Sequence, residues 1–272
     1  MLRYRPTTGE QLLDRMSPTI LVLLNLSRDQ LDRYGETDII LDRWKSAVSK
    51  VFPAPELVLD STQEMFDDFP SIFRGRVFYF DADPAHLNKT GLIGEFNAKN
   101  VNAALMVSAI LGFDNQQCVE ALESFDAAYG RGESVDYKGK HLQLFLAKNP
   151  ESFNNNLDLI SQNKLNPDTL LFMLNDNIPD GRDVSWIYDI DPLKLESACR
   201  GRNIFVTGKR CLDMAARLKY AFVNVDEKQM NPRLKEVMEL IVNSNSCNQI
   251  LALPNYSSML EMREFLVGRK IL

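Results

Sequence analysis

The sequence predicts an α/β protein in which buried parallel strands alternate with helices. The strongest observation is the run from Leu170 to Leu174, five apolar residues in succession, which is typical of a strand covered on both faces. Shorter apolar runs recur at 19–24, 57–59, 77–80, 142–147, 203–207 and 250–253. Helical patterns separate these runs, and such alternation favours parallel sheets. Because 272 residues suffice for two ordinary domains, we expect two α/β units.

Composition and charge limit the classes of partner. The net charge is −6, so no broad basic surface exists to neutralise a nucleic-acid backbone. The four cysteines are far apart and form no C-x-x-C pair, which predicts reduced thiols and neither a zinc ribbon nor a disulfide framework. The longest apolar stretch near the start, Ile20–Leu24, is too short to span a bilayer. We therefore expect a cytoplasmic protein without a transmembrane segment and without a nucleic-acid partner.

The first half of the chain predicts a small sheet with helices. After a basic stretch with a short helical pattern over residues 1–17, Thr19–Leu24 is expected to form a buried strand. An amphipathic helix is expected over Asp38–Val51, with an inward face made by Ile39, Leu41, Trp44 and Val48. Two more strands are expected at 57–59 and 77–80, and two more helices at 94–111 and 118–125.

Two polar stretches in this half are candidates for ligand binding. The first strand opens into N-L-S-R-D-Q-L-D-R-Y-G-E, and a strand that leads through polar residues into a helix is a usual place for a nucleotide or metal. The plainer alternative is an ordinary connection with Asp29 near a helix N-terminus. The next stretch, G-E-F-N-A-K-N-V-N-A-A, opens the long helix. Either Asn97 caps that helix while Asn100 and Asn102 are exposed, or these amides bind the edge of an adenine ring.

The most informative stretch follows the strand Leu170–Leu174 and reads N-D-N-I-P-D-G-R-D-V-S-W. Its Asn, Asp, Pro and Gly residues favour turns, and binding groups in open α/β sheets collect beyond the carboxyl ends of the strands. Asp180, Arg182 and Asp183 are expected at that position. The alternative is that these charges only cap and solvate a loop. Nearby, V-T-G-K-R is either a helix N-terminus that holds an anion or a standard strand-to-helix turn.

These stretches, taken in order, resemble the MurT family, the Mur-ligase-like subunits of lipid II isoglutaminyl synthase. The segment Leu174–Asp189 is similar to the family's L-N-D-N-x-x-D-G-R-D-x-S-W-I-x-D. The earlier stretches resemble N-x-x-R-D-Q-x-D-R-x-G-E and the adenine-contacting G-x-x-N-x-x-N-x-x-A-A. Further matches are G-R-x-E at 130–133 and L-x-K-N-P at 146–150. The resemblance covers about Thr19–Leu266, almost the whole chain.

The resemblance implies a fold and a set of site residues. The fold would be a shortened Mur ligase central domain over residues 1–131, a parallel sheet with helices, and a Rossmann-like Mur ligase C-terminal domain over 132–272. The residues expected to bind ATP are Asn97, Asn100, Arg131 and Lys148. Other residues expected to line the cleft are Asn25, Asp29, Asp32, Asn149, Asn175, Asp180 and Arg182.

The resemblance also implies a reaction. With ATP and Mg²⁺, the α-carboxyl of the D-glutamate in the lipid II stem peptide would become an acyl phosphate, which ammonia converts to D-isoglutamine. A GatD-type glutaminase, with a cysteine nucleophile and a histidine base, would form a heterodimer with this chain and supply the ammonia. Asp183, the last residue of D-G-R-D, would complete that triad by fixing the histidine tautomer and stabilising its cation. The work would take place in the cytoplasm, at the inner face of the membrane on a lipid-linked substrate.

The chain departs from the family's pattern in two ways. It contains no G-x-x-x-x-G-K-[ST], because Gly139-Lys140 and Gly208-Lys209 both lack the required neighbours, so we expect it to begin downstream of the phosphate loop. The family's four-cysteine zinc ribbon is also lacking, and no zinc or other metal site is expected. Without the loop, phosphoryl transfer by this polypeptide should be poor. The alternatives are therefore a catalytically degenerate docking or regulatory module, or one half of a split Mur-type ATP-dependent ligase.

Overall fold

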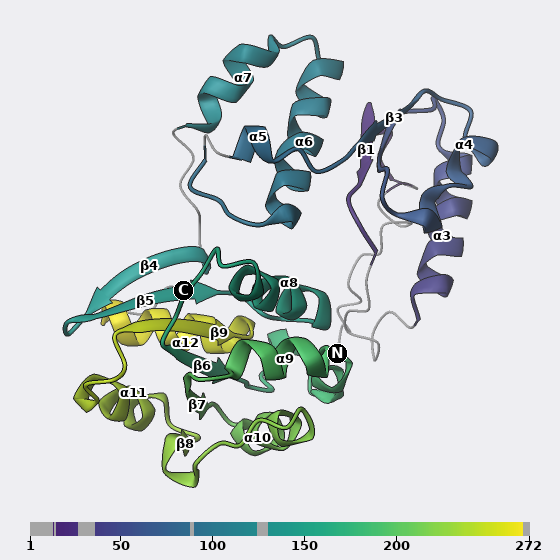
Figure 1. Cartoon of the computed structure of the whole chain (residues 1–272). Coiled ribbons are helices and arrows are strands. Elements are labelled where there is room, and N and C mark those ends of the chain that lie inside the picture. The colour runs from purple at the N-terminus through teal and green to yellow at the C-terminus, as the bar shows by residue number, and fades with distance from the viewer. Residues whose placement is uncertain (1–12, 14, 27–35, 88–89, 124–129, 269–272) are drawn as a thin grey trace. The chain divides into compact units, whose positions relative to one another are not determined.

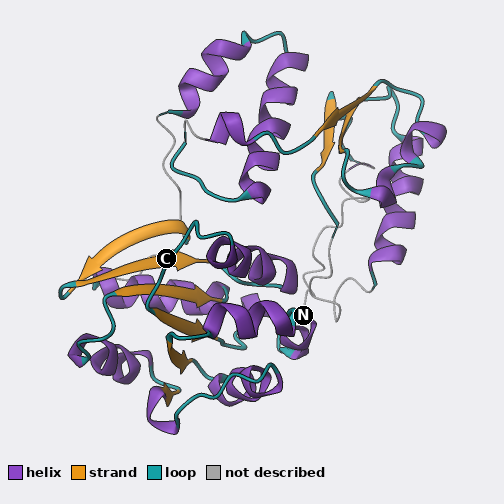
Figure 2. Ribbon diagram, viewed as in Figure 1, coloured by secondary structure: helices purple, strands orange, loops and turns teal. Residues whose placement is uncertain are grey.

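The computed structural model describes residues 13, 15–26, 36–87, 90–123 and 130–268. The chain forms two compact units. The N-terminal unit comprises Met1–Gly91 and Glu95–Asp126, and the C-terminal unit comprises Leu92–Gly94 and Ala127–Leu272. Each unit is built on its own sheet, with helices packed against it (Figures 1 and 2).

The described part of the N-terminal unit contains a parallel sheet in the order β1-β2-β3. Its strands are β1 (Ile20–Leu23), β2 (Glu56–Asp60) and β3 (Val77–Phe80). The middle strand is the best covered, since Leu57, Val58 and Leu59 are fully buried. The first strand was expected to be buried along its length, but only Leu23 is. It lies at the sheet edge, where fewer neighbours cover the side chains.

Helices cover both faces of this sheet. The helix α3 (Thr37–Lys50) packs Val48 into the core with Leu41 and Trp44 beside it, as the sequence predicts. The expectation for Ile39 is wrong: it is 50% exposed, because it lies off the face that Leu41, Trp44 and Val48 share. The helix α6 (Glu95–Ile110) covers the opposite face. The other described helices are η1 (Glu64–Phe66), α4 (Phe69–Ile72), α5 (Pro84–Leu87) and α7 (Asn115–Leu122).

The described part of the C-terminal unit contains a larger sheet in the order β4-β5-β9-β6-β7-β8. The strands are β4 (Arg131–Tyr137), β5 (Lys140–Phe145), β6 (Thr169–Met173), β7 (Asn203–Thr207), β8 (Met230–Asn231) and β9 (Gln249–Pro254). Only β4 runs antiparallel to its neighbour, and all other pairs are parallel. Every residue of β6 is buried, which confirms the two-sided strand predicted from the apolar run.

Two apolar cores lie on the two faces of this sheet because side chains alternate along a strand. Leu170 and Phe172 of β6 point into one core, and Leu171 and Met173 point into the other. The first core is completed by α8 (Pro150–Ser161), α9 (Pro192–Cys199) and α10 (Cys211–Tyr220). The second is completed by α11 (Leu234–Asn243) and α12 (Tyr256–Val267). Short 3-10 helices η2 (Ile178–Asp180), η3 (Ser185–Asp189) and η4 (Glu227–Gln229) lie between these elements.

The described helices and the cysteines bear on two expectations from the sequence, the transmembrane segment and the thiols. Within the residues that the structure describes, no helix is both long and apolar enough to cross a membrane. The four cysteines, all of them in the described ranges, carry free thiols. Cys199 is buried in the first core, and burial raises the pKa of its thiol to about 12, so it stays protonated at neutral pH.

Candidate functional site

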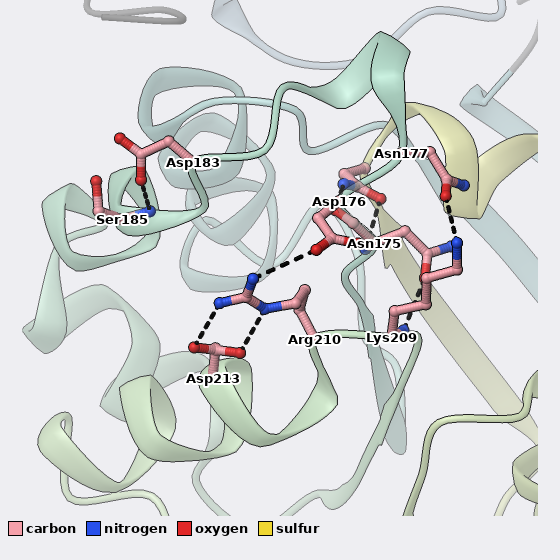
Figure 3. A network of polar contacts seen from close by, with 9 residues as sticks. Asn175, Asp176, Asn177, Asp183, Ser185, Lys209, Arg210 and Asp213 are labelled. Atoms are coloured by element: carbon pink, nitrogen blue, oxygen red, sulfur yellow. Dashed lines mark hydrogen bonds and ion pairs between the residues drawn. The ribbon is translucent and has the colours of Figure 1, made fainter. Parts of the chain in front are cut away.

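The segment after β6 is bonded at its start to two other elements by Asn175, which is only 3% exposed. Its side-chain oxygen accepts the backbone N–H of Lys209 at 2.8 Å, and its amide nitrogen donates to Glu261 at 3.0 Å. Its backbone exchanges two further bonds with the side chain of Asn255, at 3.2 and 2.7 Å. These contacts join the end of β6 to α12 and to the β7–α10 turn; Figure 3 shows Asn175 beside Lys209 of that turn.

Gly208 allows this close approach. It has φ +102°, and a Cβ at this position would lie 2.3 Å from the carbonyl oxygen of Leu174. The V-T-G-K-R stretch is therefore a strand-to-helix turn packed against the end of β6. One of its backbone amides, that of Lys209, is already bonded to Asn175.

Asp180 fixes the middle of the same segment to α12. Its carboxylate accepts the backbone N–H of Ser257 at 2.9 Å and also the hydroxyl of Ser257. Ser257 is the second residue of α12, so this carboxylate lies at the positive end of the helix dipole. Burial raises the pKa of Asp180, and the bonds from Ser257 oppose that rise.

Arg217 of α10 holds the end of the segment. This arginine is 3% exposed, and it donates to the carbonyl oxygen of Ile187 at 2.8 Å and to that of Ile190. Both isoleucines are fully buried. Burial lowers the pKa of this guanidinium, which nevertheless remains charged at neutral pH. The segment from Asn175 to Ile190 is thus bonded to the core at both ends.

Arg182 and Asp183 remain exposed between these attachments. One carboxylate oxygen of Asp183 accepts the backbone N–H of Ser185 at 2.8 Å (Figure 3). Hydrogen bonding to Ser185 lowers the pKa of Asp183, so the side chain is a carboxylate at neutral pH. A carboxylate has about four acceptor sites, and it can therefore accept another donor while the bond to Ser185 persists.

Charged side chains that sequence reasoning did not single out lie beside this segment. Arg210 makes two bonds to Asp213, at 2.7 and 3.1 Å, and one to Asp176 at 3.3 Å (Figure 3). Lys209 donates to the side chain of Asn177 at 2.6 Å. The available signal was the spacing of Arg210 and Asp213, three residues apart with opposite charges at a helix start.

An ion pair between a buried aspartate and a partly buried lysine lies at the carboxyl end of the middle strand in the N-terminal unit, and it too was missed. Asp60 is 2% exposed and accepts the backbone N–H and the hydroxyl of Thr62 at 2.9 and 2.7 Å. Its other oxygen lies 3.2 Å from the ammonium group of Lys99, which also donates to the Thr62 hydroxyl at 2.5 Å. The pair therefore joins α6 to the end of β2.

The asparagines of α6 do not cap the helix. Asn97 is the third helical residue and is buried, whereas Asn100, one turn later, is exposed. Asn102, which was expected to be exposed, is partly buried, and its amide donates to the carbonyl oxygen of Asp81 at 2.6 Å. Asn25 lies two residues beyond β1 and is exposed. The remaining candidates of that stretch, Asp29 and Asp32, lie outside the described residues.

The other ATP-binding candidates belong to the C-terminal unit. Arg131 is the first residue of β4, and Lys148 follows β5; both side chains are exposed. Asn149 is the N-cap of α8, where its oxygen accepts the backbone N–H of Ser152 at 2.9 Å. The Ser152 hydroxyl accepts the Asn149 N–H in return, which completes a capping box. Throughout the described part of the chain, no group of three or more His, Cys, Asp or Glu side chains could hold a metal ion.

Comparison with known sequences relates the chain to one family. Residues 146–259 match the family described as MurT ligase C-terminal. Lipid II isoglutaminyl synthase (glutamine-hydrolyzing) subunit MurT of Staphylococcus aureus (strain COL) is 26% identical, over 93% of this chain and 71% of that protein. The subunit of the same name from Streptococcus pneumoniae (strain ATCC BAA-255 / R6) is 24% identical, over 96% of this chain and 72% of that protein.

Solved structures show the same fold. MurF from Acinetobacter baumannii superposes with a TM-score of 0.68 at 14% identity, over 95% of this chain and 61% of that one. MurF ligase from Thermotoga maritima, solved in complex with ADP, gives 0.65 at 12% identity, over 95% of this chain and 64% of that one. The chain therefore spans less than two thirds of these solved ligases. The likeness confirms the predicted Mur ligase type of α/β fold.

Proposed function

The chain is a MurT-like member of the Mur ligase family, and from this premise we propose that it is a subunit of a glutamine-dependent amidating ligase acting on a peptidoglycan precursor. The names of its relatives support the general function. The observation that carries the finer proposal is Asp183, an exposed carboxylate on a segment bonded to the core at both ends.

Asp183 would act on the catalytic histidine of a GatD-type glutaminase subunit. An ionised carboxylate that accepts one imidazole N–H fixes the tautomer in which the other nitrogen can take a proton from the cysteine thiol. It also stabilises the imidazolium formed by that transfer. The lowered pKa of Asp183 supports this role, because the group stays charged at neutral pH and does not exchange protons itself. The ammonia released from glutamine would then attack the activated carboxyl of the lipid II stem peptide.

ATP with Mg²⁺ is the proposed cofactor of the complete ligase, where it supplies the activating phosphoryl group. Asn97 and Asn100 lie one turn apart on α6, and their amides have the donor and acceptor that an adenine edge requires. Asn100 is exposed and is the candidate for contact with the base, whereas Asn97 is buried. No G-x-x-x-x-G-K-[ST] occurs in residues 1–272, so we assign no phosphoryl-transfer step to these residues. Arg131 and Lys148 remain candidates for phosphate contact.

Reconstitution with the purified glutaminase subunit tests the role of Asp183. We expect Asp183→Asn to lower glutamine turnover by about 10³ to 10⁴-fold, the scale seen when a triad carboxylate becomes an amide. The Kd of the pair should stay within about threefold of the wild-type value. Asp136→Asn is the matched control: it makes the same change at an aspartate of β4 that is 85% exposed, and it should leave turnover within a few fold. Unchanged turnover in Asp183→Asn would falsify the assignment.

One second candidate is a docking or regulatory module, for which the exposed Asp183 on its attached segment would suffice without an ATP site. Calorimetric titration with Mg-ATP distinguishes the ligase subunit from the docking or regulatory module. Binding that weakens about tenfold in Asn100→Ala supports a working adenine site, since Asn100 is exposed and its replacement leaves the core unchanged. No binding by the wild-type chain supports the module.

A further inference from the structure

Among its described residues, the C-terminal unit exposes three aromatic side chains around the end of α10. Tyr188 is 52% exposed, Tyr220 is 72% exposed and Phe222 is 86% exposed. The rings of Tyr188 and Tyr220 meet edge to face, with centroids 6.1 Å apart. We call these three residues the aromatic patch. Exposed aromatic side chains are enriched at protein–protein contacts and depleted elsewhere on surfaces, so the patch needs an explanation beyond the fold.

The backbone of Phe222 strengthens this argument. The chain leaves α10 through a turn in which Val223 donates to the carbonyl oxygen of Leu218, and Phe222 there has φ +58°. Glycine or asparagine is the usual residue at such a helix end, because a side chain strains a positive φ. A phenylalanine at this position adds strain and exposes its ring. Its presence therefore does not serve the stability of the unit.

The patch and Asp183 belong to one rigid piece of the molecule. Tyr188 lies on η3, which begins two residues after Asp183, and Tyr220 is the last residue of α10. Arg217 of the same helix bonds to the backbone on both sides of Tyr188, at Ile187 and Ile190. Residues 184–187 separate Asp183 from Tyr188: two Cα steps lead from Asp183 to the start of η3 and three more lie within it, which limits the distance between the two Cα atoms to about 13 Å.

We propose that the aromatic patch is the docking surface through which the glutamine-hydrolysing subunit binds beside Asp183. The inference rests on the proposed function. A partner that brings an imidazole to Asp183 must also cover the surface around it. A standard interface buries about 800 Å² on each side, which corresponds to a radius of about 16 Å. Tyr188 falls inside that radius, and Tyr220 packs against it. The aromatic side chains would supply the large buried contacts that anchor such an interface.

The experiment measures binding of the full chain to the purified glutaminase subunit, and turnover of glutamine as the chain is titrated. Tyr220→Asp is expected to raise the Kd about 30-fold or more, while turnover at saturating chain returns to the wild-type value. Phe222→Gly is expected to raise the Kd about tenfold without lowering the midpoint of urea unfolding, because glycine suits the positive φ. Phe113→Asp, an aromatic residue 63% exposed in the N-terminal unit, is the control and should bind normally.

The outcomes separate this proposal from the function on which it rests. If the wild-type chain does not bind the glutaminase subunit, both are overturned. If it binds, and Asp183→Asn lowers turnover while Tyr220→Asp and Phe222→Gly bind like the wild type, the docking surface is overturned and the role of Asp183 stands. Weaker binding by both patch variants, with turnover recovered at saturation, supports the docking surface.

Discussion

The two units each end a parallel sheet with polar side chains, but they use those side chains differently. In the C-terminal unit, Asn175 and Asp180 bind the chain itself, and the exposed groups Arg182 and Asp183 lie between Asp180 and Ile187, which is bonded to Arg217. In the N-terminal unit the polar groups form an ion pair between the buried Asp60 and the partly buried Lys99. The difference teaches that polar residues at a strand end are often internal attachments. The candidates for function are those left exposed on an attached segment.

The largest expected effect comes from the turn that the C-terminal unit depends on. Gly208→Ala should lower the free energy of unfolding by more than about 3 kcal/mol, because the new Cβ meets the Leu174 carbonyl and φ is +102°. Gly181→Ala is the control: its φ is +82°, but nothing lies within 4 Å of the new Cβ. That change should cost about 1 to 2 kcal/mol, from backbone strain alone. Equal losses would show that the close approach at Gly208 does not matter.

Each unit can be followed separately, because the chain has two tryptophans and one lies in each. Trp44 packs in the core of the N-terminal unit, and Trp186 packs near Phe153 in that of the C-terminal unit. Urea unfolding monitored by fluorescence in Trp186→Phe therefore reports the N-terminal unit, and in Trp44→Phe the C-terminal unit. The free energy of unfolding of each variant is measured in the tryptophan background that reports the unit carrying the substitution.

The next effect is on the ion pair of Asp60 and Lys99. Lys99→Met should destabilise the N-terminal unit by about 3 kcal/mol, because it leaves the buried Asp60 carboxylate without its counter-charge. The double variant with Asp60→Asn should recover much of that loss, since no buried charge remains. Lys209→Met is the comparison in the other unit, where an exposed lysine contacts Asn177, and it should cost less than about 1 kcal/mol. No recovery in the double variant would argue against burial of charge as the cause.

A smaller effect is expected at Asn175. Asn175→Ala removes the side-chain acceptor of the Lys209 amide and the donor to Glu261, and it should destabilise the C-terminal unit by about 2 kcal/mol. Among the described contacts, the side chain of Asn177 bonds only to the exposed Lys209, and Asn177→Ala should cost less than about 0.5 kcal/mol. If the two variants lose the same stability, Asn175 is not the attachment described above.

The smallest expected effect is the dependence of stability on pH. It has opposite signs at Asp180 and Asp183, two carboxylates of one segment. The pKa of Asp180 is raised by burial, so its contribution to stability is present below pH 3.8 and is lost as the pH rises through its folded pKa. The pKa of Asp183 is lowered by bonding to Ser185, so its contribution is present above 3.8 and is lost as the pH falls through its folded pKa. Unfolding measured between pH 2.5 and about 6 should show both slopes, each absent from the matching Asp→Asn variant.

The fold was largely predictable from the sequence, because buried strands leave apolar runs that need no tertiary information. The strand at Leu170–Leu174 and its parallel neighbours are examples. The exposure of β1 was not predictable, because it depends on which elements cover the sheet edge. The exposure of Ile39 could have been predicted, because helical spacing places it off the face that Leu41, Trp44 and Val48 share.

The site was only partly predictable. Sequence reasoning found the loop that carries Asp183, since turn residues follow a buried strand there. It missed Asp60 with Lys99, because residues distant along the chain reveal their pairing only after folding, and it missed Arg210 with Asp213 although their three-residue spacing was an available signal. Distance along the chain also hid the bond between Asp180 and Ser257. The cap of α8 by Asn149 is local, and the signal for it was the proline that follows at the first helical position.

The attachment of η3 to α10 through Arg217 has a thermodynamic consequence. The segment from Asn175 to Ile190 cannot detach locally without breaking bonds to α10 and α12. Its amide hydrogens should therefore exchange with solvent as slowly as those of the core, and more slowly than those of the surface loops. Any molecule that binds Asp183 in the native state then stabilises both helices by mass action. A ligand bound to the exposed Asp183 would thus slow amide hydrogen exchange throughout the C-terminal unit.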